Sequence, residues 1–183
     1  MDILAHCKVY PISNYINIPL EIEPVSQCGI VHIILDEIKN KSYQWIHLRE
    51  EDDQDIIVID LMNVWMRDDN IIKDPYLINL QNLIKFLNDE LYSGNFFAHG
   101  NYERLQGIII DNLSIYKYGK DINKLFNILL KLLLKIRYKY GCWIKTTSFK
   151  DTLGKYPTRI PLNYLNGMDK IIQYKSHEFH QIK

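Results

Sequence analysis

The stretch GIVHIILDEIKNKS, residues 29–42, places an apolar run before a turn that ends in a Lys-Ser pair. Phosphate-binding loops share this outline, because their glycines let backbone N–H groups approach phosphates while Lys and a hydroxyl bind phosphate and magnesium. Residues 36–42 contain no glycine, are one residue too few and begin with two carboxylates. Cβ atoms and like charge both oppose a polyphosphate there. We therefore predict a buried strand followed by a helix start at Lys41 and Ser42, with a degenerate nucleotide site.

The composition is that of one domain spanning residues 1–183. The chain is 47% hydrophobic, which is enough for a single buried core. Neither a membrane-spanning run nor a secretory leader is expected from its apolar segments, so we predict a soluble, intracellular protein without membrane contact. Cys7, Cys28 and Cys142 form no C-x-x-C pair, which favours reduced thiols.

Apolar runs and helical periodicity alternate along the chain. Four Ile- and Val-rich runs predict buried strands, and two amphipathic segments, 74–92 and a segment from Asp121 to about Gly141, predict helices. This alternation predicts an α/β fold with a mostly parallel sheet and helices on both faces. A terminal antiparallel pair is expected at 169–174 and 178–182, and an irregular loop at 93–103. The four predicted strands are 29–35, 56–62, 107–111 and 142–147.

Charge is unevenly distributed although the net charge is zero. Residues 21–69 hold 12 acidic and 4 basic side chains, whereas residues 113–160 hold 11 basic and 2 acidic ones. Such polarity can steer an anionic partner to one side of the molecule. Alternatively, the basic side chains only solvate exposed helix faces.

Single titratable residues give weak signals. Asp111 ends the run GIIID, where a P-loop protein presents a magnesium-orienting carboxylate, but a carboxylate there can also turn the chain. His177 and His180 have no third ligand at suitable spacing, so we expect no metal site.

Taken in order, the strand motifs GIVHIIL, DIIVIDLMNVW, GIIIDNLSIY and GCWIKTTSF resemble the core of RecA-type recombinases. The segments VYPISNYI, YINIPLEI, IIIDNLS, GCWI and YPTRIPLNYLNGMD resemble, more narrowly, the platinum sensitivity proteins of the yeast Shu complex. These are divergent recombinase paralogues that assist homologous recombination. The resemblance spans nearly the whole chain and implies a RecA-like fold.

The resemblance also shows which catalytic groups are missing. Met62 stands where active recombinases carry the Glu that positions the attacking water, and Ser148 stands where they carry the Gln that senses the terminal phosphate. Only Asp111 keeps its type, and one carboxylate alone does not sustain phosphoryl transfer. The resemblance therefore implies a pseudo-ATPase that binds no cofactor, not an enzyme.

The family's two DNA-binding loops correspond to residues 115–124 and 148–161 of this chain. Cations beside aromatic rings suit single-stranded DNA, because the charges follow phosphates and the rings stack on bases. Alternatively, Tyr116, Tyr118 and Tyr156 pack on the sheet and the cations only solvate the loops. The candidate DNA-binding residues are Lys117, Lys120, Lys150, Lys155 and Arg159.

The leading hypothesis is a non-catalytic, nuclear DNA-binding subunit of a Shu-type complex that promotes recombinase filament assembly in homologous recombination repair and error-free damage tolerance. The implied partners are single-stranded or forked DNA, another divergent recombinase paralogue in a heterodimer, other Shu subunits and recombinase mediators. Trp65, Phe96, Phe97 and the run 129–134 are candidates for burial against a partner, although Leu132 and Leu133 can equally fill the chain's own core. The alternatives are a residual ATPase that uses Lys41, Ser42 and Asp111, and a structural bridge without DNA contact.

Overall fold

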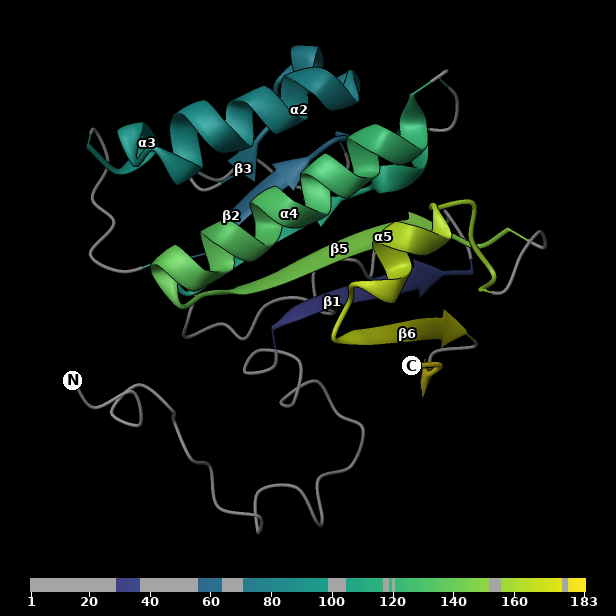
Figure 1. Ribbon diagram of the computed structural model, residues 1–183. Helices are drawn as coiled ribbons and strands as arrows, with labels where there is room; N and C mark the ends of the chain where they lie inside the picture. The colour runs from purple at the N-terminus through teal and green to yellow at the C-terminus, as the bar shows by residue number, and fades with distance from the viewer. Residues whose placement is uncertain are drawn as a thin grey trace, which may run out of the picture.

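A seven-stranded sheet forms the centre of the protein (Figure 1). The computed structural model describes residues 29–36, 56–63, 71–98, 105–116, 119, 121–151, 156–175 and 178–183. The strand order is β3-β2-β4-β5-β1-β6-β7, and within these residues every neighbouring pair is parallel except β6 and β7, which are antiparallel. The strands are β1 (Ile30–Leu35), β2 (Ile56–Asp60), β3 (Ile71–Ile72), β4 (Gly107–Asp111), β5 (Trp143–Phe149), β6 (Lys170–Lys175) and β7 (Glu178–Gln181).

The predicted α/β fold with a mostly parallel sheet is confirmed. All four predicted strands and the terminal antiparallel pair are present, with shifted ends. The second strand stops at Asp60 because the Met62 N–H turns back to Asp60 Oδ1 at 3.2 Å. β5 continues to Phe149 because its last residue still pairs with Leu35 of β1.

The long helix α4 (Ile122–Tyr140) is present where its periodicity predicts it. Gly141 ends it in the left-handed region, with φ +64°, and its N–H bonds to the Arg137 carbonyl. Glycine adopts this conformation without the penalty that a Cβ would bring. The prediction for this segment is confirmed.

The predicted single helix over residues 74–92 is wrong in detail. It is divided into a 3₁₀ turn η5 (Pro75–Ile78), the helix α2 (Leu80–Phe86) and a π-helical turn η6 (Leu87–Tyr92). The break lies at Asn79, whose backbone is extended and whose side chain accepts the Gln81 N–H at 2.9 Å. Asn79 is thus a second N-cap inside the periodic segment, and a cap residue favours a new helix start over continuation.

Two short helices are present that the sequence analysis does not predict. The first, α3 (Asn95–Ala98), lies in the expected loop 93–103, and its two phenylalanines are half-buried against the main core. The second, α5 (Leu162–Asn166), follows Pro161. Within the run 129–134, Leu129, Leu132 and Leu133 are buried in the chain's own core, while Leu134 is exposed. Trp65 lies outside the described residues.

The helices of the described part pack on one face of the sheet (Figure 1). There Ile34, Ile59, Ile110, Ile144 and Ile171 join the buried side chains of α2, η6, α4 and α5 in one apolar cluster. The opposite face holds two smaller buried clusters made only of strand residues. Helices on that second face stay a prediction, because it concerns residues outside the described ranges. No helix in the described part is long and apolar enough to span a bilayer.

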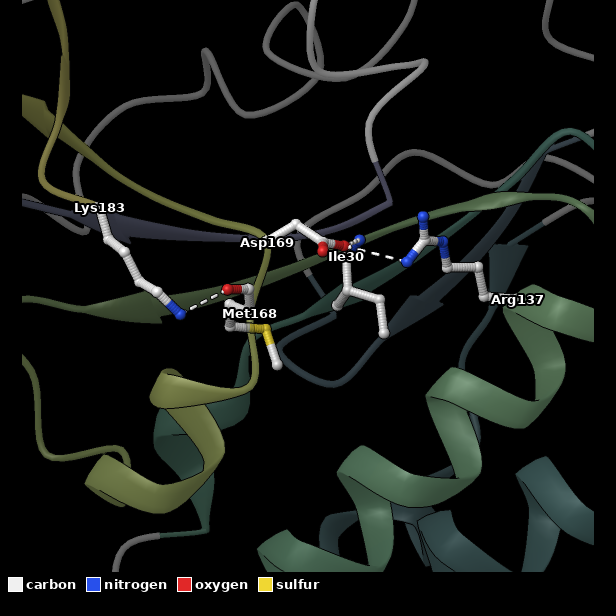
Figure 2. A network of polar contacts seen from close by, with 5 residues as sticks. All are labelled: Ile30, Arg137, Met168, Asp169 and Lys183. Carbon is white, nitrogen blue, oxygen red and sulfur yellow. Dashed lines mark hydrogen bonds and ion pairs between the residues drawn. The ribbon is translucent and has the colours of Figure 1, made fainter. Parts of the chain in front are cut away.

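A polar network holds the amino end of β1 (Figure 2). Asp169, just before β6, accepts the Ile30 N–H at 2.7 Å and lies 3.1 Å from the Arg137 guanidinium of α4. Beside it, Lys183 donates to the Met168 carbonyl at 2.7 Å. The network joins β1, α4, the start of β6 and the chain's last residue at the edge of the sheet away from the carboxyl strand ends.

Candidate nucleic-acid interface

The carboxyl ends of the parallel strands bring the two predicted DNA-binding loops together. Parallel neighbours end at the same edge of a sheet, which is where such folds bind ligands. The first loop begins in the 3₁₀ turn η7 (Leu113–Ile115) after β4, and the second begins after β5. They are joined directly, because Ser114 Oγ accepts the Phe149 N–H at 2.7 Å.

A surface hollow of about 340 Å³, counted with the solvent at its mouth, lies between these loops. Residues from both loops line it, so segments far apart in sequence form one site. The lining residues are Leu113, Ser114, Tyr116, Phe149, Lys150, Asp151, Arg159 and Ile160.

Two predicted cations, Lys150 and Arg159, line this hollow together. Their side chains are 35% and 44% exposed. Each has a carboxylate beside it: Lys150 Nζ lies 3.3 Å from Asp36 Oδ2, and Arg159 is paired with Asp151. Exposed ion pairs contribute only about 0 to 1 kcal/mol, so a phosphate can replace either carboxylate as the partner of the cation.

Lys117, Lys120 and Lys155, together with Tyr118, lie outside the described residues. The structure therefore brings two of the five candidate residues to one hollow.

The predicted stacking of Tyr116 and Tyr156 on bases is wrong. Both rings are 7% exposed and belong to the main apolar core. The Tyr116 hydroxyl donates to the Leu77 carbonyl, and burial raises the pKa of Tyr116 well above its ordinary value. The alternative interpretation, in which these two tyrosines pack on the sheet, is correct. Burying each ring stabilises the fold more than leaving it exposed to water.

The carboxylates at the ends of β2 and β4, Asp60 and Asp111, contact other side chains of the protein. Asp111 is buried and accepts a hydrogen bond from Thr147 Oγ1. Its neighbour across the sheet is a second buried carboxylate, Asp60, which lies 3.3 Å from Lys73 Nζ. Two adjacent carboxylates disfavour a polyphosphate. Lys41 and Ser42 lie outside the described residues, and the described part has no group of three His, Cys, Asp or Glu side chains that could hold a metal.

A buried polar network beneath the hollow is missed by the sequence interpretation. His32 of β1 lies 2.8 Å from Thr146 Oγ1 through Nδ1 and 2.8 Å from Ser148 Oγ through Nε2. Ser148 in turn contacts Thr158 Oγ1 at 2.8 Å, and Tyr164 of α5 donates to Thr146. Burial lowers the pKa of His32 to about 3, so the ring is neutral. Two features of the sequence could have indicated this network: a histidine inside the apolar run of β1, and two hydroxyl residues, Thr146 and Ser148, spaced two apart on β5.

This network positions Arg159 at the hollow. Thr158 is 4% exposed, and its Oγ1 also accepts the Ile160 N–H, so the residues on both sides of Arg159 are held in place. Arg159, between Thr158 and Ile160, is exposed at the rim of the hollow. Ser148 thus has a structural role in holding the second loop.

Comparison with known proteins gives one curated relative and a family model. A model described as the Shu complex component Psy3, DNA-binding, matches residues 7–177. Platinum sensitivity protein 3 of Saccharomyces cerevisiae is 30% identical, over 94% of this chain and 92% of that protein.

A solved structure matches this chain weakly. The KaiC-like protein of the archaeon Pyrococcus horikoshii is 13% identical, with a TM-score of 0.49 over 84% of this chain and 76% of that one. The family match and the curated relative both cover nearly the whole sequence. The chain therefore belongs to the family of the Shu complex component Psy3.

Proposed function

We propose that this chain is a non-catalytic DNA-binding subunit of a Shu-type recombinase-paralogue complex. In this role it promotes recombinase filament assembly in homologous recombination repair and error-free damage tolerance, as a nuclear protein. The observation that supports DNA contact most directly is the hollow at the carboxyl strand ends, where Lys150 and Arg159 lie together on a scaffold formed by both loops. The proposed protein partners are another divergent recombinase paralogue in a heterodimer, other Shu subunits and recombinase mediators.

Nucleic-acid binding at this hollow would rest on charge and shape. Lys150 and Arg159 can each contact a phosphate, and contacts of that kind position the backbone without reading bases. Tyr116 and Tyr156 are buried in the core, so they contribute less base stacking than a basic-aromatic loop would suggest. Binding is expected to depend on salt and on DNA structure more than on sequence.

The absence of catalysis is supported by the replaced residues. Met62 has no basic atom where a water-positioning group is required, and Ser148 Oγ is already engaged with His32 and Thr158. Asp111 is engaged by Thr147. A residual ATPase remains the alternative, and calorimetric titration with Mg-ATP tests it: heat of binding that disappears in Asp111→Ala would favour the enzyme.

Fluorescence anisotropy with single-stranded and forked oligonucleotides tests DNA binding. Wild-type protein, alone and in its complex, should lose affinity steeply as salt rises from about 50 to about 200 mM. Lys150→Ala and Arg159→Ala should each reduce the slope of log affinity against log salt concentration by about 0.7 in magnitude for single strands, because each variant loses one phosphate contact. Lys85→Ala, on the exposed side of α2, is the matched control and should change little.

Two results would contradict the proposal. Unchanged affinity and salt slope in the Lys150→Ala/Arg159→Ala double variant would remove the hollow as the binding site. No binding by the wild-type protein or its complex would favour the structural bridge.

A further inference from the structure

One side of α4 forms an exposed surface that carries both basic and apolar side chains. It runs along the helix on the side turned away from the sheet, and α4 lies across the front of the molecule in Figure 1. Its residues recur at helical spacing, which places them on one side. We call it the α4 face; its members are Lys124, Ile128, Lys131, Leu134, Lys135 and Tyr138.

The basic charge of α4 is not balanced by acidic residues of the same helix, although Lys135 Nζ lies over the Tyr92 ring of η6, 6.0 Å from its centre. No Asp or Glu occurs in Ile122–Tyr140. Lys131, Lys135 and Lys139 follow one another at four-residue spacing, and like charges at that spacing destabilise a helix. The elements that pack against α4 carry Asp89 and Glu90, both half-buried on η6, and Asp169, which is paired with Arg137. Lys124 and Lys131 therefore point their charge to solvent on the α4 face.

The same face leaves apolar groups in water. Tyr138 is 93% exposed, Leu134 41% and Ile128 40%. The core side of α4 is already filled by Phe126, Leu129, Leu132, Leu133 and Ile136. Leu134 and Tyr138 are adjacent at four-residue spacing, so their side chains form one apolar strip beside Lys131.

We propose that the α4 face docks an acidic, amphipathic segment of a partner subunit, with carboxylates on the lysines and apolar side chains on Leu134 and Tyr138. The proposal rests on the proposed function in that it requires a partner subunit. Charge complementarity requires an acidic occupant, and a second copy of this helix would bring cations against cations. DNA phosphates can pair with the lysines, but they make no favourable contact with an aliphatic side chain such as Leu134. An acidic amphipathic protein segment satisfies both.

The α4 face is a different part of the surface from the DNA-binding hollow. The hollow is lined by residues of η7, the end of β5 and the segment around Arg159, and it contains no residue of α4. Partner docking and DNA binding can therefore be removed separately.

The test measures assembly of the complex after co-expression with the other Shu subunits. Leu134→Ser/Tyr138→Ser should weaken the affinity of the purified chain for the remaining subunits by about tenfold or more, since apolar anchors dominate interfaces. The matched control is Tyr76→Ser/Ile78→Ser, which removes comparably exposed apolar groups from η5 and should leave the affinity unchanged. Circular dichroism and thermal melting check that both variants are folded.

A second measurement uses only wild-type protein. Lysine acetylation followed by mass spectrometry should show Lys131 and Lys135 protected in the complex and labelled in the free chain, while Lys85 of α2 is labelled in both. Lys131→Glu should slow association with the partner, and the salt dependence of that rate should fall, because charge pairs at an interface steer encounter.

Several outcomes would overturn the inference. They are full assembly by Leu134→Ser/Tyr138→Ser, equal loss in the η5 control, unprotected Lys131 and Lys135 in the complex, or loss of oligonucleotide binding with assembly intact. The last result would make the α4 face a DNA surface. If wild-type chains do not assemble at all, the proposed function fails and this inference falls with it, whereas DNA binding through Lys150 is measured independently.

Discussion

Acidification should destabilise this protein through one buried histidine. His32 is fully buried, and burial lowers its pKa from 6.5 to about 3. In the unfolded chain the ring takes up a proton below pH 6.5, but in the folded chain it stays neutral between its two hydroxyl partners. The unfolded state therefore binds more protons in this range, so stability falls as the pH decreases from 6.5 toward 3.

The size of the effect follows from the two pKa values. Each pH unit between them costs about 1.4 kcal/mol, so lowering the pH from about 7.5 to about 5 should reduce the free energy of unfolding by about 2 kcal/mol. That is a large part of the stability of a small domain. Above neutral pH the ring is uncharged in both states and contributes no pH dependence.

Urea denaturation at several pH values measures this contribution. His32→Gln keeps a polar side chain without a titratable ring, so its stability at neutral pH is lower but its pH dependence over this range should be flatter than that of wild type. The difference between the two slopes isolates His32 from the carboxylates, which titrate in both proteins. Parallel pH profiles for wild type and His32→Gln would refute the reasoning, since the buried ring would then not resist protonation.

Two further substitutions test the two edges of the sheet at which the parallel strands begin and end, and a third serves as a control. Asp36→Asn frees Lys150 from its carboxylate, so affinity for single-stranded DNA should rise, by at most about fivefold given the 0 to 1 kcal/mol value of an exposed pair; a fall in anisotropy-measured affinity would show that the pair orients Lys150 productively. At the opposite edge, Gly29 has φ +82°, and a Cβ there would lie 2.0 Å from Asp169 Oδ2. Gly29→Ala should cost more than about 2 kcal/mol by urea denaturation, from left-handed strain plus a displaced hydrogen bond. Gly141→Ala, with φ +64° and open space around its Cβ, should cost only the strain, and equal losses for the two would contradict the packing argument.

Much of the fold could be predicted because its signals are local. The strands of the parallel sheet are continuous apolar runs, since both faces of such a sheet are buried. The helix α4 repeats apolar residues at helical spacing and ends at a glycine. The division of the 74–92 segment could not be predicted from periodicity, because leucines recur across the break and only the extended backbone at Asn79 separates the two parts.

The candidate site was only partly predictable, because its contacts join residues that are far apart in the sequence. Lys150 and Arg159 are nine residues apart in sequence, and their charge suggested a shared role. Their carboxylate partners, in particular Asp36 at the end of β1, are found only once β1 and β5 are adjacent. A tyrosine that stacks on a base and a tyrosine that packs in the core look the same in the sequence. Only their burial in the structure shows that Tyr116 and Tyr156 belong to the core.

By itself, the amino-acid sequence determined that the chain forms a mostly parallel sheet and which chemical groups follow each strand, because periodicity and the chemical type of a side chain are carried by individual positions. The tertiary structure decided which side chains share a hollow, which carboxylates partner its cations, and that His32 is neutral. Those properties depend on distances and burial between strands far apart in sequence, and these exist only after the sheet has assembled.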